Sequence, residues 1–174
     1  SEIAREAIEA GASIINDVSG GNLDEDMFAT VGDLKVPYIL MHMRGTPATM
    51  QSLTNYQHLM KDVVLDLSEK IKKLRSLQIN DVIIDPGFGF AKTLEQNYEM
   101  LNNLGYFDVL ECPLLVGVSR KSMIYKLLGN EAKDALNGTT ALNMASLLNG
   151  ANILRVHDVK EAVETVKLFN QLKN

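Results

Sequence analysis

Asp85 stands at the end of a buried strand, immediately before a glycine-rich loop. The β-branched run Val82–Ile84 predicts a strand covered on both faces, and Pro86 cannot continue a central strand. In the segment Asp85–Phe90 (DPGFGF), two glycines let the backbone approach a ligand and two phenylalanines offer flat apolar surfaces. A carboxylate beside aromatic rings suits a planar ligand with several N–H donors. The alternative is a strand-to-helix turn in which Asp85 bonds its own loop.

Arg155 and His157 lie just before the last predicted helix. The first N–H groups of a helix are unpaired and its dipole favours an anion. A guanidinium can fork onto phosphate oxygens, and an imidazole can add a donor. The pair therefore favours a phosphate or a pyrophosphate. The alternative is that Arg155 pairs with a neighbouring carboxylate while His157 packs against the sheet.

Three other strand ends also carry polar side chains. The segment Ser119–Ser122 places Arg120 and Lys121 between two serines, as a carboxylate or phosphate site requires, although two basic residues on a loop are often only solvated. Asn16 could pair with the edge of a heterocycle or make an Asx turn. The third strand end carries His42 and Arg44, whose roles are ambiguous.

Strands and helices alternate along the chain after an initial helix that ends at Gly11. Strands are predicted at residues 12–15, 36–41, 82–85, 114–118 and 152–154. A long amphipathic helix is predicted over residues 59–77, a short apolar turn over 124–128 and a small-residue helix over 139–149. Capping boxes predict four helix starts, at Asn22 with Glu25, Thr54 with Gln57, Thr93 with Gln96, and Asp158 with Glu161.

This alternation of apolar strands and helices predicts an α/β fold with a parallel sheet and helices outside it. The polar strand ends would then meet at one edge, where α/β barrels build their active sites and where open doubly wound sheets also bind ligands. His58 and Lys61 fall on the polar side of the long helix and are predicted to be surface residues. No cluster of His, Cys and Asp has the spacing of metal ligands, and no Ser-His-Asp arrangement is suggested.

Composition narrows the class of protein. The 174 residues are 46% hydrophobic and 22% charged, which fits one soluble domain with a real core. A net charge of −5 without a basic stripe argues against a nucleic-acid partner. Cys112 is the only cysteine, so a disulfide framework is excluded and a reducing compartment is expected. The absence of a membrane-length apolar run or a signal-peptide pattern predicts a cytoplasmic protein without a membrane partner.

Five segments in chain order together resemble the dihydropteroate synthase family of pterin-binding barrels. They are Ile15–Asp17, Leu40–Met43, Ile84–Phe90, Gly117–Ser122 and Arg155–Asp158. The resemblance implies a (β/α)8 TIM barrel that joins 6-hydroxymethyl-7,8-dihydropterin pyrophosphate to p-aminobenzoate and releases pyrophosphate. It further implies competition by sulfonamides, a Mg²⁺ ion and a homodimer.

The resemblance also implies roles for individual residues. Asn16, Met41 and Asp85 would contact the pterin. Lys121 would hold the pterin during the reaction, and catalysis would rest on Lys121, Asp85 and Arg155. The pyrophosphate would be bound by the segment Arg155, Val156 and His157. The border of the p-aminobenzoate site would be formed by Phe90, Ser119, Arg120 and Ser122.

The chain departs from this family in its number of strands. A (β/α)8 barrel needs about 250 residues and eight strands, whereas five strands are predicted here. The resemblance implies that the first three strands, with the residue that binds Mg²⁺, are not in this sequence. Residues 1–174 are therefore expected to be the C-terminal portion of one barrel domain, and a chain that opens at Ser1 within a helical pattern fits a fragment. The alternatives are a pterin methyltransferase of the methyltetrahydrofolate type and a non-catalytic truncated barrel that only binds pterin or phosphate.

Overall fold

The strands form one parallel series in the order of the chain. In the computed structural model, which describes residues 1–173, strands β1 (Ile15–Asp17), β2 (Tyr38–Met41) and β3 (Val82–Asp85) pair in that order. Strands β4 (Leu115–Val116) and β5 (Ile153–Leu154) form a second parallel pair. A single bridge between Ile84 and Leu114 joins the two groups. A doubly wound sheet reverses its strand order, so this monotonic order favours part of a barrel.

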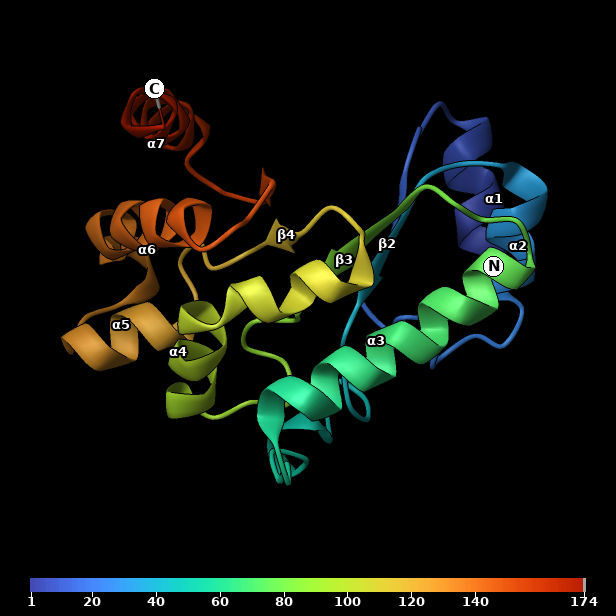
Figure 1. The fold of residues 1–174 in the computed structure, drawn as a ribbon, viewed down its shortest axis with the longest axis horizontal. Helices are drawn as coiled ribbons and strands as arrows, with labels where there is room; N and C mark the ends of the chain where they lie inside the picture. The colour runs from blue at the N-terminus through green and yellow to red at the C-terminus, as the bar shows by residue number, and fades with distance from the viewer. Residues whose placement is uncertain (174) are drawn as a thin grey trace.

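Helices follow the strands and lie outside them. The α-helices are α1 (Glu2–Glu9), α2 (Met27–Leu34), α3 (Leu59–Ser76), α4 (Leu94–Asn102), α5 (Ser122–Leu128), α6 (Leu136–Leu148) and α7 (Val159–Leu172). Three 3-10 segments are η1 (Met50–Ser52), η2 (Leu104–Leu110) and η3 (Ala132–Asp134). Helices α1 and α2 lie at one end of the molecule, and α6 and α7 at the other (Figure 1). None of the helices within residues 1–173 is both long and apolar enough to cross a membrane.

The core lies between the strands and the long helix α3. Helix α3 buries the apolar stripe that its sequence predicts, including Val63, Leu67 and Leu74, none of which is exposed. Leu40 and Ile84 are buried in the same cluster, on β2 and β3. His58 and Lys61 are exposed, as predicted. The hydrophobic periodicity of the sequence therefore identified the face that packs on the sheet.

Most of the predicted elements are present with boundaries shifted by one to three residues, such as the helix predicted over residues 139–149, which is α6 (Leu136–Leu148), and two differences are larger. Residues 12–14 are exposed and unpaired, and β1 begins only at Ile15, where the chain reaches the partner strand β2. The predicted apolar turn at residues 124–128 is instead the helix α5, which begins at Ser122 and ends where Gly129 takes a left-handed conformation (φ +68°).

The capping box of Thr93 and Gln96 is confirmed. The Thr93 hydroxyl accepts a hydrogen bond from the Gln96 N–H at 3.2 Å, and the Gln96 side chain accepts one from the Thr93 N–H at 2.9 Å. Each partner thus satisfies a backbone donor that the first turn of α4 would otherwise leave unpaired. The box fixes the start of α4 directly after the Asp85 loop.

The other three predicted capping boxes do not form. Asn22 donates to the Met43 carbonyl at 3.2 Å, and α2 begins only at Met27. The backbone carbonyl of Thr54 accepts a hydrogen bond from the Gln96 side chain, and α3 begins only at Leu59. Asp158 does precede α7, but its carboxylate binds Arg120 and makes no capping bond.

Candidate functional site

Three residues predicted to contact one ligand lie on the same face of the sheet. Asn16 is paired with Ile39, and Met41 is paired with Asp85. Paired residues of parallel strands share a face, and side chains two apart on one strand do as well. Asn16, Met41 and Asp85 therefore point to the face opposite the buried core residue Ile84. The register thus brings together side chains that are far apart in the sequence.

Asp85 is the acid at the centre of this face. Its side chain is buried, and its Oδ1 accepts a hydrogen bond from the Gly87 N–H at 2.8 Å. Burial raises the pKa of Asp85, while the Gly87 bond and the positive charges of Lys121, Lys92 and Arg155 act in the opposite direction. The structure gives Oδ2 no partner among residues 1–173. A carboxylate oxygen is therefore left to accept from a ligand.

Lys121 approaches the same loop from the start of α5. Its Nζ donates to the carbonyl oxygen of Phe88 and lies 5.0 Å from the centroid of the Phe90 ring. Burial lowers the pKa of Lys121; Asp85 opposes this effect and Arg155 adds to it. The site thus combines a carboxyl group, an amino group and an aromatic ring, supplied by Asp85, Lys121 and Phe90.

Ser119 and His157 connect the ends of β4 and β5. The Ser119 hydroxyl lies 2.9 Å from Nδ1 of His157 and accepts a hydrogen bond from the His157 N–H at 3.1 Å. Ser119 is buried whereas His157 is exposed, so the serine orients the imidazole and leaves Nε2 facing outward. Arg155 is also exposed and forms no ion pair within residues 1–173. The pairing of Arg155 with a carboxylate, which the sequence left open, is therefore not what the structure has.

Arg120 donates four hydrogen bonds from its side chain to other segments of the protein. Its Nε and one terminal nitrogen donate to the two carboxylate oxygens of Asp158, at 2.9 and 2.7 Å. The other terminal nitrogen donates to the carbonyls of Ala132 and Lys133. This side chain fastens α7 and η3 to the loop after β4. Its predicted place at the border of a p-aminobenzoate site stays a prediction, as does that of the half-buried Ser122.

Asp17 does not share the surroundings of its neighbour Asn16, and Val156 does not share those of its neighbour Arg155. The carboxylate of Asp17 accepts from the Tyr38 hydroxyl at 2.7 Å and from the Ser19 and Gly21 N–H groups. It therefore fixes the loop after β1 and faces the core. Val156 is half-buried beside apolar residues of α7.

Sequence reasoning missed Lys92 and left His42 undecided. Lys92 Nζ lies 3.1 Å from Nδ1 of His42 and 3.1 Å from the carbonyl oxygens of both Gly87 and Phe90. Burial lowers the pKa of Lys92 to about 7, with Asp85 opposing the shift. The sequence offered one signal for Lys92: it lies between the apolar loop that ends at Phe90 and the helix cap Thr93, a place where a solvent-exposed side chain is not expected.

The comparison with known families decides the family to which the chain belongs. Residues 1–157 match the model of a family described as pterin binding enzyme. The chain belongs to the pterin-binding enzyme family. This membership confirms the family resemblance that the five sequence segments indicated, while the roles of the individual site residues stay predictions.

Relatives of this chain include dihydropteroate synthases. The chain is 41% identical to the enzyme of Synechocystis sp., over 98% of this chain and 60% of that protein. Two structures from Thermus thermophilus are 35% identical with TM-scores of 0.94. One is a complex with 6HMPPP, the other with 4-aminobenzoate; the match covers 99% of this chain and 69% and 71% of theirs. The chain thus spans about 60% of the length of the first curated relative. The predicted fold class, a partial (β/α)8 barrel, is confirmed.

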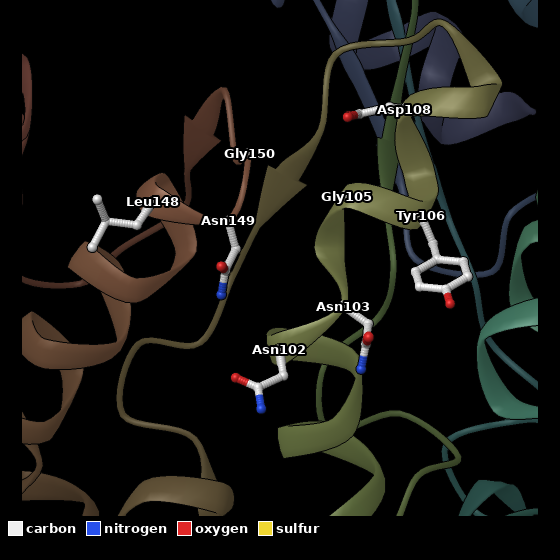
Figure 2. A pocket seen from close by; sticks show the side chains of 8 residues that line it. All are labelled: Asn102, Asn103, Gly105, Tyr106, Asp108, Leu148, Asn149 and Gly150. Carbon is white, nitrogen blue, oxygen red and sulfur yellow. The ribbon is translucent and has the colours of Figure 1, made fainter. Parts of the chain in front are cut away.

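A separate hollow on the molecule lies away from the strand-end site. It has a volume of about 690 Å³ and opens between the α4–η2 segment and the end of α6 (Figure 2). Its lining residues are Asn102, Asn103, Gly105, Tyr106, Asp108, Leu148, Asn149 and Gly150. These residues precede β4 and β5, so the hollow lies at the amino ends of the strands. In barrels of this kind that end supports stability, and the chemistry occurs at the carboxyl ends.

Residues 1–173 do not assemble a recognisable metal centre. Within this part of the chain, no group of three His, Cys, Asp or Glu side chains could hold a metal ion. The expected Mg²⁺ therefore has no fitting ligand set here, and its binding residue stays predicted for a part of the barrel outside this sequence.

Proposed function

We propose that this chain carries the substrate-binding residues of a dihydropteroate synthase. The reaction joins 6-hydroxymethyl-7,8-dihydropterin pyrophosphate to p-aminobenzoate and releases pyrophosphate. The observation that carries the proposal is the shared sheet face of Asn16, Met41 and Asp85, with Lys121 beside it and Arg155 close enough to influence the Asp85 carboxyl. Relatives solved with 6HMPPP and with 4-aminobenzoate support the two substrate classes.

The pterin would bind across the face that holds Asp85. A pterin ring edge presents a ring N–H beside an exocyclic amine, and a carboxylate can accept from both. The nearby positive charges of Lys121 and Arg155 favour the ionised acid that this contact needs. Asn16 would pair with another edge of the ring, and the buried Met41 side chain would supply an apolar wall.

The pyrophosphate would bind at the end of β5. Arg155 and His157 are exposed there, directly before α7, a helix of 14 residues. The helix N-terminus and the guanidinium both stabilise negative charge, which grows as pyrophosphate departs. Ser119 would hold the imidazole in one orientation, because it contacts Nδ1 and leaves Nε2 for the anion.

The chemical step would be dissociative. The bond between the pterin methylene and the pyrophosphate oxygen breaks, and its electron pair leaves with pyrophosphate. The resulting cation is delocalised over the pterin, the aniline nitrogen of p-aminobenzoate forms the new C–N bond, and that nitrogen then loses a proton. The chain's own residues would position the two substrates and stabilise the departing charge. The border of the p-aminobenzoate site is proposed to include Phe90, Ser119, Arg120 and Ser122.

We also propose that the protein forms a homodimer. Helices α6 and α7 pack together and expose Leu148, Leu168 and Leu172, which a second copy could cover. Light scattering after gel filtration measures the mass directly. A mass of one chain at all concentrations would contradict this part of the proposal.

The test of function is p-aminobenzoate-dependent release of pyrophosphate from the dihydropterin pyrophosphate, with Mg²⁺ supplied. We expect turnover that a sulfonamide inhibits, in this chain or in a longer polypeptide that contains it and supplies the remaining strands. Pyrophosphate and pterin binding without turnover in either would favour a non-catalytic barrel. Pterin binding without any pyrophosphate binding would favour a methyltransferase of the methyltetrahydrofolate type.

A further inference from the structure

The loop between Asp85 and α4 is held by side chains that have no predicted contact with a substrate. Lys92 lies beneath this loop and is 4% exposed. Its Nζ is 3.1 Å from the carbonyl oxygen of Gly87 and 3.1 Å from that of Phe90. The two carbonyls stand at opposite ends of the segment that carries both phenylalanine rings. One ammonium thus fixes both ends of the loop.

The third contact of Lys92 is Nδ1 of His42, also at 3.1 Å. His42 is 1% exposed, and burial lowers the pKa of its imidazole to about 2, so the ring is neutral. The positive charges of Lys92, Lys70 and Arg44 act in the same direction. An ammonium has three N–H donors, and here it faces three acceptors. A neutral amine could keep all three contacts by accepting from His42 Nδ1–H while it donates to the two carbonyls.

Asn97 on α4 holds the middle of the same loop. Its Oδ1 accepts a hydrogen bond from the Gly89 N–H at 2.7 Å, and its Nδ2 donates to the Thr93 carbonyl at 2.6 Å. Lys121 donates to the Phe88 carbonyl from the ligand side. The loop therefore has two sets of supports, of which only the Lys121 contact lies on the side predicted to meet the pterin.

We propose that Lys92, seated against His42, is a positioning residue for the pterin site that fixes the loop from Gly87 to Phe90. The loop's backbone supplies the Gly87 N–H that orients Asp85, and it carries the Phe90 ring that packs near Lys121. Without the lysine, the carbonyls of Gly87 and Phe90 would lose a charged donor in a buried place. The loop would then sample other conformations, and Asp85 would lose its fixed aim. This inference rests on the proposed function only where it names the pterin.

The main test compares Lys92→Met with the matched control Lys160→Met, whose side chain is exposed on α7. Binding of 6-hydroxymethylpterin is followed by its fluorescence, and binding of inorganic pyrophosphate by calorimetry. We expect the first variant to bind the pterin at least about 10-fold more weakly, as loss of a buried charged donor predicts, and pyrophosphate within about twofold of the unchanged chain. A general loss of structure would weaken both ligands together, so this split separates positioning from stability.

Amide hydrogen exchange supplies a readout that needs no ligand. In the unchanged chain, Gly89 and Phe90 should exchange slowly, and Lys92→Met should accelerate them at least about tenfold while β1 is unaffected. If Lys92→Met does not fold, two variants of His42 are compared in its place. His42→Gln keeps an acceptor for Lys92, and His42→Leu removes that acceptor. Only the leucine variant should free the loop.

The outcomes separate the two proposals. An unchanged chain that binds no pterin, with a loop that Lys92→Met loosens, would remove the proposed function and keep the positioning role of Lys92. Unchanged pterin affinity and unchanged exchange in a folded Lys92→Met variant would overturn the inference. Equal behaviour of His42→Gln and His42→Leu in the fallback experiment would overturn it as well.

Discussion

A Cβ atom placed on Gly87 would collide with the carbonyl oxygen of His42. The loop after β3 therefore crosses the end of β2 with no room for a side chain. The same two strand ends are joined by a hydrogen bond from the His42 N–H to the Asp85 carbonyl at 2.9 Å. Gly87 also has a positive φ of +74°. The position of the Asp85 carboxylate depends on this close backbone approach.

Gly87→Ala tests that approach, and Gly129→Ala is the matched control. Both glycines have a positive φ, but a Cβ on Gly129 would meet no atom within 4 Å. Left-handed strain alone should destabilise Gly129→Ala by about 1–2 kcal/mol, whereas the added clash should bring Gly87→Ala to about 3–5 kcal/mol. Urea unfolding measures both values. Equal losses of stability would show that the loop moves away from His42 without difficulty.

Asp85→Asn should weaken pterin binding while the protein stays folded. The amide oxygen can still accept from the Gly87 N–H, but a neutral side chain cannot accept two bonds from a pterin edge. Loss of one charged hydrogen bond corresponds to about 1.5–3 kcal/mol, or roughly 10- to 100-fold in affinity. Fluorescence titration with 6-hydroxymethylpterin measures it. The exposed Asp81→Asn, at the start of the same strand, should bind as the unchanged chain does.

Ser119→Ala should weaken the anion site at His157. The variant removes the acceptor of the His157 N–H and the partner of Nδ1, so the imidazole can rotate away from the anion. A neutral hydrogen bond is worth about 0.5–1.5 kcal/mol, so pyrophosphate affinity should fall about two- to tenfold by calorimetry. Ser13→Ala, in the exposed segment before β1, is the control. An unchanged affinity would mean that Ser119 does not orient the ring.

Asp17 should make the stability of the fold depend on pH. Burial raises the pKa of Asp17, but hydrogen bonds from Tyr38, Ser19 and Gly21 outweigh it and hold the pKa below its ordinary value of 3.8. A lowered pKa adds stability that is present above pH 3.8 and is lost as the pH falls through the folded value. At pH 7, Asp17→Asn should therefore destabilise the protein by about 1.5–3 kcal/mol.

The pH series is the decisive part of that measurement. Thermal unfolding of Asp17→Asn and the unchanged chain should begin to converge below pH 3.8 and should agree once the pH lies below the lower pKa that Asp17 has in the folded protein, because the acid is then protonated in both folded and unfolded states. The exposed Asp108→Asn, in η2, should show no such difference at any pH. A gap of constant size from about pH 7 to about pH 3 would contradict the linkage.

Much of the architecture could be predicted because its signals are local. The apolar runs before Asp85 and Lys121 identify buried strands, and the stripe through Val63 and Leu67 identifies the packed face of α3. Local signals fail where distant groups compete. Asp158 looks like a helix cap in sequence, yet the bidentate guanidinium of Arg120 takes its carboxylate.

The same limit applies to the site. The strand ends indicated Asp85 and Arg155 as site residues, and in the structure the positive charge of Arg155 acts to lower the pKa of Asp85, while their roles toward a ligand stay predictions. They could not reveal Lys92, because its three acceptors are a histidine 50 residues away and two carbonyls whose direction depends on the loop conformation. Asn16 and Asp17 are neighbouring polar residues after the same predicted strand, and only the alternation of faces in the folded strand places them on opposite sides of the sheet.

The bridge between Ile84 and Leu114 has a consequence for how the molecule fluctuates. It is the one strand pairing within residues 1–173 between the β1–β3 group and the β4–β5 group, and β4 and β5 contain two residues each. A strand pairing as limited as this one is a place where local opening is expected. Asp85 and Lys92 lie on one side of it, and Lys121 and Arg155 on the other. In the proposed reaction, Asp85 would contact the pterin and Arg155 the pyrophosphate, so stiffness at this strand pairing would govern how well these two groups of the substrate are aligned.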